Sequence, residues 1–119
     1  MRVLVVDDSN LIRSRLIRIF SAGGNVDVIG STGDEEFDLL KSFNPDIVVL
    51  DIKLNKRSGV DILKSIKTTS PGTIVAMLTN YYDQYYLNRC KELGADYFFD
   101  KSMDFEKLAD LINDFESLH

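Results

Sequence analysis

Five short apolar runs alternate with five amphipathic stretches along the chain. The runs predicted to be β-strands are RVLVV (2–6), VDVIGS (26–31), DIVVLD (46–51), TIVAML (73–78) and DYFFD (96–100). The first, third and fourth runs are nearly continuous in Val, Ile and Leu, which is typical of strands covered on both faces.

The stretches between these runs have helical periodicity. They are LIRSRLIRIF (11–20), DEEFDLLKSF (34–43), GVDILKSIK (59–67), NYYDQYYLNRC (80–90) and DFEKLADLINDF (104–115). In the first of them Ile12, Leu16 and Ile19 share one face. Strand–helix alternation repeated five times predicts an α/β fold, with a doubly wound five-stranded parallel sheet and helices on both of its faces.

Polar residues stand where four of the predicted strands end. The first strand runs into Asp7 and Asp8, the third ends at Asp51, the fourth is followed by Thr79, and the fifth by Lys101. Ligands of open α/β sheets bind beyond the carboxyl ends of the strands. We therefore expect three acids, a hydroxyl and an ammonium to meet at one edge of the sheet.

This set of side chains suggests phosphoryl chemistry. Adjacent carboxylates such as Asp7 and Asp8 repel each other and are costly to desolvate without a compensating cation. Clustered carboxylate oxygens suit a hard ion such as Mg²⁺. The isolated Asp51 is the best candidate for a nucleophile toward phosphorus, and an ammonium and a hydroxyl would stabilise the oxygens of the transferring group.

The residues Asp7-Asp8, Asp51, Thr79 and Lys101, at these spacings, resemble the receiver domain of bacterial two-component response regulators over the whole chain. The resemblance implies a flavodoxin-like sheet in the order 2-1-3-4-5. It also implies that residues 1–119 form a single receiver domain, with no output domain in this chain.

The resemblance assigns roles to the site residues. Asp51 would be the phosphoacceptor, receiving its phosphoryl group from a histidine kinase or a phosphotransfer protein. Mg²⁺, with Mn²⁺ as an alternative ion, would be bound by Asp8, Asp51 and the backbone carbonyl of Lys53, while Asp7 would act through a metal-bound water. The protein would be a regulator rather than an enzyme, catalysing at most its own phosphorylation and dephosphorylation.

The same resemblance implies a conformational switch. Lys101 would pair with the phosphoryl oxygens, Thr79 would move to bond one of them, and Phe98 would rotate inward after it. Gly59 stands where the family has its loop glycine. Phe98 alone, in the sequence YFF, fits a core position as well as a switch position.

Four tyrosines crowd the fourth predicted helix: Tyr81, Tyr82, Tyr85 and Tyr86. Exposed aromatic side chains mark interfaces, although tyrosine rings also lie flat over the edge of a core with their hydroxyls in water. In the receiver family this helix, the fifth strand and the last helix form the face that changes on phosphorylation. The resemblance therefore implies a downstream protein partner or a homodimer at this face.

Two other functions remain open from the residues. A phosphatase of the haloacid-dehalogenase type also forms an aspartyl phosphate with Mg²⁺, but it needs Asp-x-Asp, and position 9 is Ser9. A flavodoxin-like redox carrier would need a phosphate-binding loop where Asp7 and Asp8 stand. The acid pair could also simply complement the N-terminus of the following helix.

Composition and net charge limit the binding partners and the cellular location that we expect for the protein. A chain of 119 residues is long enough for one hydrophobic core. Its net charge of −5 disfavours direct binding to nucleic acid or to an anionic membrane. The lone Cys90, which we expect to be a buried small hydrophobic residue, fits a reducing compartment, and no apolar run is long enough to span a membrane. These features favour a cytoplasmic location.

Overall fold

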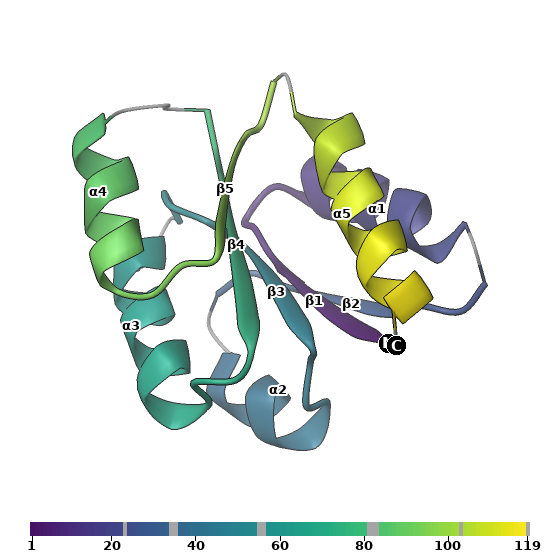
Figure 1. The fold of residues 1–119 in the computed structure, drawn as a ribbon, viewed down its shortest axis with the longest axis horizontal. Helices are drawn as coiled ribbons and strands as arrows, with labels where there is room; N and C mark the ends of the chain where they lie inside the picture. The colour runs from purple at the N-terminus through teal and green to yellow at the C-terminus, as the bar shows by residue number, and fades with distance from the viewer. Residues whose placement is uncertain (23, 34–35, 55–56, 81–83, 103, 119) are drawn as a thin grey trace.

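The computed structural model describes residues 1–22, 24–33, 36–54, 57–80, 84–102 and 104–118, and in them strands and helices alternate as the hydrophobic pattern predicts (Figure 1). The strands are β1 (Arg2–Val6), β2 (Asp27–Ser31), β3 (Ile47–Asp51), β4 (Ile74–Thr79) and β5 (Tyr97–Asp100). The helices are α1 (Asn10–Ser21), α2 (Glu36–Ser42), α3 (Gly59–Thr69), α4 (Gln84–Glu92) and α5 (Phe105–Leu118).

The strands form one parallel sheet in the order β2-β1-β3-β4-β5, which confirms the predicted flavodoxin-like topology. The central strands β1, β3 and β4 are buried along nearly their whole length, whereas the edge strands β2 and β5 are largely half-exposed. The strand order reverses at β1, so the ends of β1 and β3 flank the position where ligands of such sheets bind.

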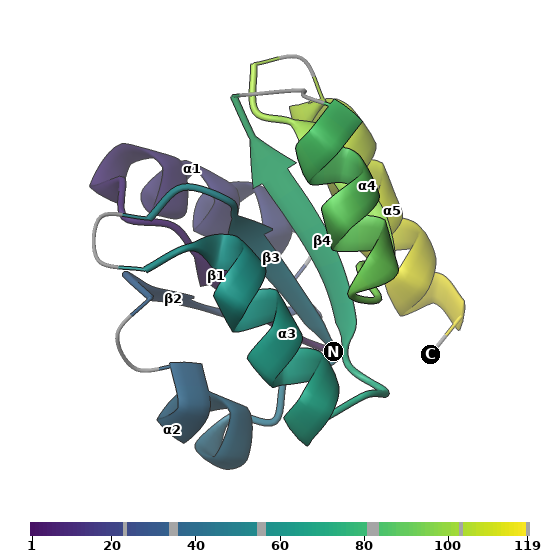
Figure 2. The same cartoon turned by 90° about the vertical axis from the view of Figure 1, so that its left-hand side faces the viewer.

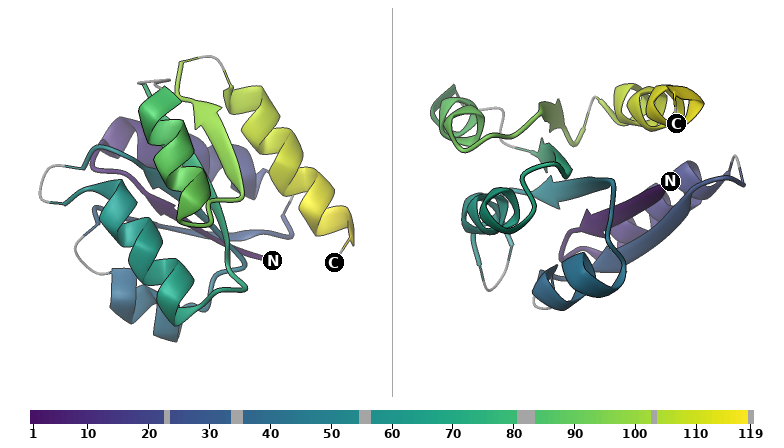
Figure 3. Two further views of the ribbon diagram at one scale, coloured as in Figure 1. Left: turned by 60° about the vertical axis from the view of Figure 1, so that its left-hand side comes forward. Right: turned by 60° about the horizontal axis from the view of Figure 1, so that its bottom comes forward.

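Each face of the sheet has its own hydrophobic core, because successive side chains of a strand point to opposite faces. Leu4 and Val6 of β1 belong to the core under α2, α3 and α4, and Val3 and Val5 to the core under α1 and α5. Figures 2 and 3 show these two sets of helices on opposite sides of the sheet. The lone Cys90 is fully buried in the first core, as predicted.

The first residues of two helices are fixed by serine caps. The side chain of Ser9 accepts a hydrogen bond from the backbone N–H of Ile12, and that of Ser58 from the backbone N–H of Val60. Both caps follow directly on strand-end loops, so they fix where the loops after β1 and β3 enter their helices. None of the helices in the described part of the chain is long and apolar enough to span a membrane.

The second core should depend on α5. Ile112 is fully buried against β-strand residues and α1, so Ile112→Ala should lower the free energy of unfolding by about 2–5 kcal/mol. The exposed Asp114 on the same helix is the control, and Asp114→Ala should change it by less than about 0.5 kcal/mol. Urea denaturation followed by circular dichroism measures both free energies of unfolding. Equal effects of the two substitutions would contradict the packing of α5 against the second core.

Candidate functional site

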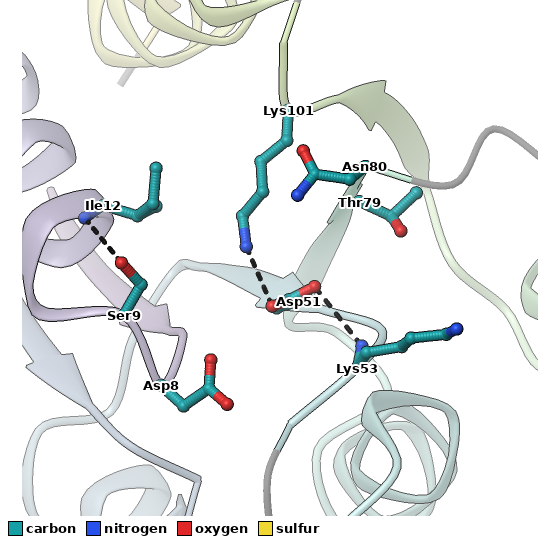
Figure 4. A pocket seen from close by; sticks show the side chains of 8 residues that line it. All are labelled: Asp8, Ser9, Ile12, Asp51, Lys53, Thr79, Asn80 and Lys101. Atoms are coloured by element: carbon teal, nitrogen blue, oxygen red, sulfur yellow. Dashed lines mark hydrogen bonds and ion pairs between the residues drawn. The ribbon is translucent and has the colours of Figure 1, made fainter.

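A cleft of about 350 Å³ opens at the carboxyl edge of the sheet (Figure 4). Its walls come from the ends of β1, β3, β4 and β5 and from the start of α1. The lining residues are Asp8, Ser9, Ile12, Asp51, Lys53, Thr79, Asn80 and Lys101. The residues predicted from the strand ends therefore meet here, with the exception of Asp7, which lies beside the cleft without lining it.

Lys101 holds two of the carboxylates together. Its Nζ lies 2.7 Å from Oδ2 of Asp7 and 2.9 Å from Oδ2 of Asp51, and all three side chains are nearly buried. The backbone N–H of Lys101 donates to the carbonyl of Thr79 at 2.8 Å, which extends the pairing of β4 and β5 by one residue. This extension aims the lysine from β5 across the sheet toward β1 and β3.

Asp7 is the most deeply buried of the three acids, with 1% of its surface exposed. Its Oδ1 accepts a hydrogen bond from the backbone N–H of Ser9 at 2.9 Å, and its own N–H donates to the carbonyl of Ser31 at 3.0 Å. Its Oδ2 meets Lys101 as an ion pair rather than as a well-directed hydrogen bond. Asp7 is thus fixed by its neighbours before any ligand enters the cleft.

The acid cluster fits a hard divalent cation. Asp7, Asp8 and Asp51 each offer a carboxylate oxygen, and these atoms lie within 4.8 Å of one another. Among the described residues, the ammonium of Lys101 pairs with Asp7 and Asp51, and its single positive charge offsets only part of the charge of the three carboxylates. Such an all-oxygen set without sulfur or imidazole is typical of Mg²⁺ and Mn²⁺.

Asp8 and Lys53 frame the space in front of Asp51. The carboxylate of Asp8 points into the cleft, whereas the side chain of Lys53 extends away from it (Figure 4). The backbone N–H of Lys53 donates a long hydrogen bond of 3.3 Å to Oδ1 of Asp51. The backbone of Lys53, rather than its ammonium, is therefore the part that faces the acid.

The titration of Asp51 and Lys101 reflects their burial and their contact. Burial raises the pKa of the Asp51 carboxyl; the hydrogen bond from Lys101 opposes this rise and the charge of Asp7 adds to it, so that the pKa lies above its usual value. Burial would lower the pKa of Lys101, but its close contacts with the carboxylates of Asp7 and Asp51 outweigh that effect and raise it. Lys101 therefore remains an ammonium at neutral pH.

The loop after Asp51 closes so tightly that only glycine fits at position 59. The backbone N–H of Gly59 donates to the carbonyl of Ile52 at 2.7 Å, and Lys53 and Ser58 form a β-bridge. A Cβ atom built on Gly59 would lie 1.9 Å from the backbone oxygen of Asp51. The resemblance placed a glycine here, and the structure supplies the steric reason.

The residues expected to act in a switch lie around the cleft and on the neighbouring face. Thr79 is buried at the last position of β4 and lines the cleft. Phe98 is half-buried against the first core, which matches the core position weighed for it. On α4, Tyr85 is 70% exposed, whereas Tyr86 packs on the first core. Of these two tyrosines, Tyr85 is therefore the one that faces solvent. Tyr81 and Tyr82 lie outside the described residues.

Two residues near the site were not expected from the sequence. Ile12 forms an apolar part of the cleft wall, and Nη1 of Arg13 donates a hydrogen bond of 2.5 Å to the backbone oxygen of Asp7. Both follow the Ser9 cap on the first turns of α1. That spacing is the one signal in the sequence that could have placed them beside the acid pair.

Comparisons with known proteins assign the class of protein to which the chain belongs. The family model of the response regulator receiver domain matches residues 3–113. The chain is 31% identical over 111 residues to sporulation initiation phosphotransferase F of Bacillus subtilis, a match that covers 93% of this chain and 90% of that protein. The chain belongs to the receiver-domain family of two-component response regulators, which are signalling proteins.

Other relatives are longer. The chain is 25% identical over 114 residues to the transcriptional regulatory protein DegU of Brevibacillus brevis, covering 94% of this chain and 48% of that protein. A protein-glutamate methylesterase/protein-glutamine glutaminase of Rhizobium etli is 40% identical over 80 residues, covering 66% of this chain and 23% of that protein. The chain thus spans half or less of both these relatives.

Solved structures agree on the fold. A signal receiver domain from Colwellia psychrerythraea superimposes with a TM-score of 0.91 at 23% identity, covering 98% of both chains. The receiver domain of DrrB, described as BeF3 activated, has a TM-score of 0.81 at 31% identity and covers 98% of this chain and 97% of that one. Both are receiver domains by their descriptions, and both likenesses confirm the predicted fold.

Gly59→Ala should distort the loop behind Asp51. Because its Cβ would meet a backbone oxygen at 1.9 Å, the substitution should lower the free energy of unfolding by about 2 kcal/mol or more. Gly72, whose Cβ would meet nothing within 4 Å, is the control, and Gly72→Ala should stay within about 0.5 kcal/mol. Chemical denaturation measures both. Equal stability of the two variants would contradict the steric reason given for Gly59.

Burial of the Asp51 charge predicts a pH-dependent difference between wild type and Asp51→Asn. The folded-state pKa of Asp51 lies above its unfolded value, so between these two pKa values the folded protein binds more protons than the unfolded chain. The free energy of unfolding of wild type therefore falls as pH rises through this range. Asparagine has no such titration, so the stability of Asp51→Asn relative to wild type should increase from pH 4 to pH 7 without divalent ions.

The measurement is urea denaturation in EDTA at several pH values. Asp27→Asn removes one negative charge at an exposed position of the edge strand β2 and serves as the control. Its difference from wild type should change less with pH than that of Asp51→Asn. A stability difference for Asp51→Asn that shrinks as pH rises would show that ionised Asp51 is well accommodated, against the expectation.

Proposed function

We propose that this protein is a phosphoacceptor of a two-component phosphorelay, with Asp51 as the residue that receives the phosphoryl group. The observation that carries the proposal is the pairing of Asp51 with Lys101 in the wall of the cleft that Asp8 also lines. The cleft would then hold Asp51 as the nucleophile, Lys101 as a cation for the phosphoryl oxygens and Asp8 as a second carboxylate for a metal ion.

The transfer follows from these contacts. Oδ2 of Asp51 is held by Lys101 at 2.9 Å, whereas Oδ1 accepts a longer hydrogen bond of 3.3 Å from the backbone N–H of Lys53. This difference favours Oδ1 as the attacking atom. An oxygen–phosphorus bond forms at Asp51 as the nitrogen–phosphorus bond of the donor's phosphohistidine breaks. The electron pair returns to the imidazole, which takes up a proton from solvent.

A divalent cation completes the site. Asp8, Asp51 and the backbone carbonyl of Lys53 would bind Mg²⁺ directly, and Asp7 would act through a bound water. When bound, the ion supplies positive charge that offsets the repulsion between the carboxylates and the incoming phosphoryl oxygens. Lys101 supplies further positive charge from the end of β5, where its ammonium pairs with Asp7 and Asp51.

Phosphorylation would be read out at the face of α4, β5 and α5. Thr79 ends β4 inside the cleft, and Phe98 lies on the neighbouring strand β5, where its register partner is Met77. We propose that Thr79 moves toward the phosphoryl group and that Phe98 follows. The exposed side chains of Tyr85 and Tyr97 lie on α4 and β5 and would contact a downstream protein or a second copy of the chain.

The relatives support this placement in a relay. The B. subtilis relative is named a sporulation initiation phosphotransferase, which supports a role in phosphoryl transfer for the present chain. The chain would accept its phosphoryl group from a histidine kinase or a phosphotransfer protein. Residues 1–119 would act as one receiver domain in the cytoplasm. Neither the phosphatase nor the redox-carrier alternative gains support from the site or from the comparisons.

Incubation with acetyl phosphate and Mg²⁺, followed by intact-mass spectrometry, tests the proposal. Wild type should gain the mass of one phosphoryl group, EDTA should prevent the gain, and hydroxylamine should remove the adduct because acyl phosphates react with it. Asp51→Asn should show no adduct.

Asp61→Asn is the matched control, since Asp61 is an exposed acid in the first turn of α3. That variant should be phosphorylated as wild type is. An adduct that persists in Asp51→Asn would place the phosphoacceptor elsewhere. Absence of an adduct on wild type, with phosphohistidine donors as well as with acetyl phosphate, would leave the fold but overturn the function.

A further inference from the structure

The backbone of the Asp7-Asp8 pair is held by an arginine that no role in phosphoryl transfer accounts for. Nη1 of Arg13 donates to the backbone oxygen of Asp7 at 2.5 Å, and Nη2 donates to the side-chain oxygen of Asn10. The guanidinium therefore bridges the strand-end loop and the first turn of α1. A planar, forked donor can make both contacts at once, which a lysine ammonium on a flexible stem does less well.

A glycine in β2 makes room for this arginine. A Cβ atom on Gly30 would lie 3.2 Å from Cδ of Arg13 and 3.3 Å from Cδ1 of Ile17. Both distances are tighter than ordinary van der Waals contact, so any larger residue would push the arginine stem. Gly30 is thus part of the seat of Arg13, on a strand whose end adds no charged residue to the cleft.

Arg13 completes a three-way fixation of Asp7. The carbonyl of Ser31 accepts the N–H of Asp7, the N–H of Ser9 binds its Oδ1, and Arg13 binds its backbone oxygen. That oxygen belongs to the peptide that joins Asp7 to Asp8. Its orientation sets the direction from which the Asp8 side chain enters the cleft, so the contact from Arg13 acts on the one acid of the pair that lines the cleft.

We propose that Arg13 is a positioning residue for the divalent-cation site, acting through the Asp7–Asp8 peptide; this inference rests on the metal site of the proposed function. The guanidinium donates to the backbone oxygen of Asp7 and to the side-chain oxygen of Asn10, and in the described part of the chain neither carboxylate of the acid pair is among its partners. It therefore fixes the acid pair without competing with the cation for its ligands.

The direction in which Mg²⁺ affinity changes when Arg13 is removed distinguishes a positioning role from a purely electrostatic effect of its charge. Arg13 carries a positive charge near an acidic site, so by Coulomb's law its removal alone should strengthen cation binding. Loss of positioning should weaken binding instead, and partners that orient metal ligands contribute about 10-fold or more to affinity. Weakened binding in Arg13→Met is therefore a result that electrostatics would not give.

The experiment titrates MgCl2 into wild type, Arg13→Met and Arg18→Met, following the Mg²⁺-dependent rise in melting temperature and the heat of binding. Arg18 is exposed on the same helix and controls for the loss of one positive charge. We expect the dissociation constant for Mg²⁺ to rise about 10-fold in Arg13→Met and to stay at or below the wild-type value in Arg18→Met. Unchanged or tighter binding in Arg13→Met would overturn the inference.

Two further variants keep the inference testable if Arg13→Met does not fold. Gly30→Ala keeps the arginine but crowds its stem, and it should weaken Mg²⁺ binding in the same direction by a smaller factor. Arg13→Lys keeps the charge without the fork and should be intermediate. Wild-type affinity in both would overturn the positioning role alone, whereas absence of Mg²⁺ binding by wild type would overturn the metal site of the proposed function as well.

Discussion

The ammonium of Lys101, shared between Asp7 and Asp51, is the interaction on which the site depends. It joins the ends of three strands, β1, β3 and β5, that are brought together only by the sheet. Two nearly buried carboxylates beside each other would be unstable without it, because removal of one member of a buried charge cluster leaves its partners uncompensated. The same contact holds Asp51 in the geometry from which it would act. The ammonium of Lys101 therefore both stabilises the buried carboxylates and positions Asp51 for its proposed role.

Much of this arrangement could be predicted from the sequence. The Val- and Ile-rich runs defined the buried strands because a parallel sheet covered on both faces leaves little choice of residue. The carboxyl ends of parallel strands lie at one edge of the sheet, so the sequence alone predicts that Asp51, Thr79 and Lys101 lie close together. The strand bounds differ from the prediction by no more than one residue at each end.

What the sequence could not supply is the part that depends on the backbone in three dimensions. The position of Asp7 beside the cleft rather than in its wall follows from hydrogen bonds to Ser9 and Ser31, which no local pattern encodes. The contact between Arg13 and the backbone oxygen of Asp7 joins the start of the amphipathic helix α1, where an arginine ordinarily faces solvent, to the loop that follows β1. The requirement at Gly59 is visible only once the carbonyl of Asp51 has been placed.

The sheet divides the interior into two cores that have few side chains in common, one beneath α1 and α5 and the other beneath α2, α3 and α4. Energetic effects of distant, independent positions add. Substitutions on opposite faces should therefore combine additively, so that one face can accumulate changes while the packing of the other is retained. The packing beneath α1 and α5 can then be inherited unchanged while the face that carries α4 diversifies toward new partners. The two faces of the sheet can in this way evolve separately.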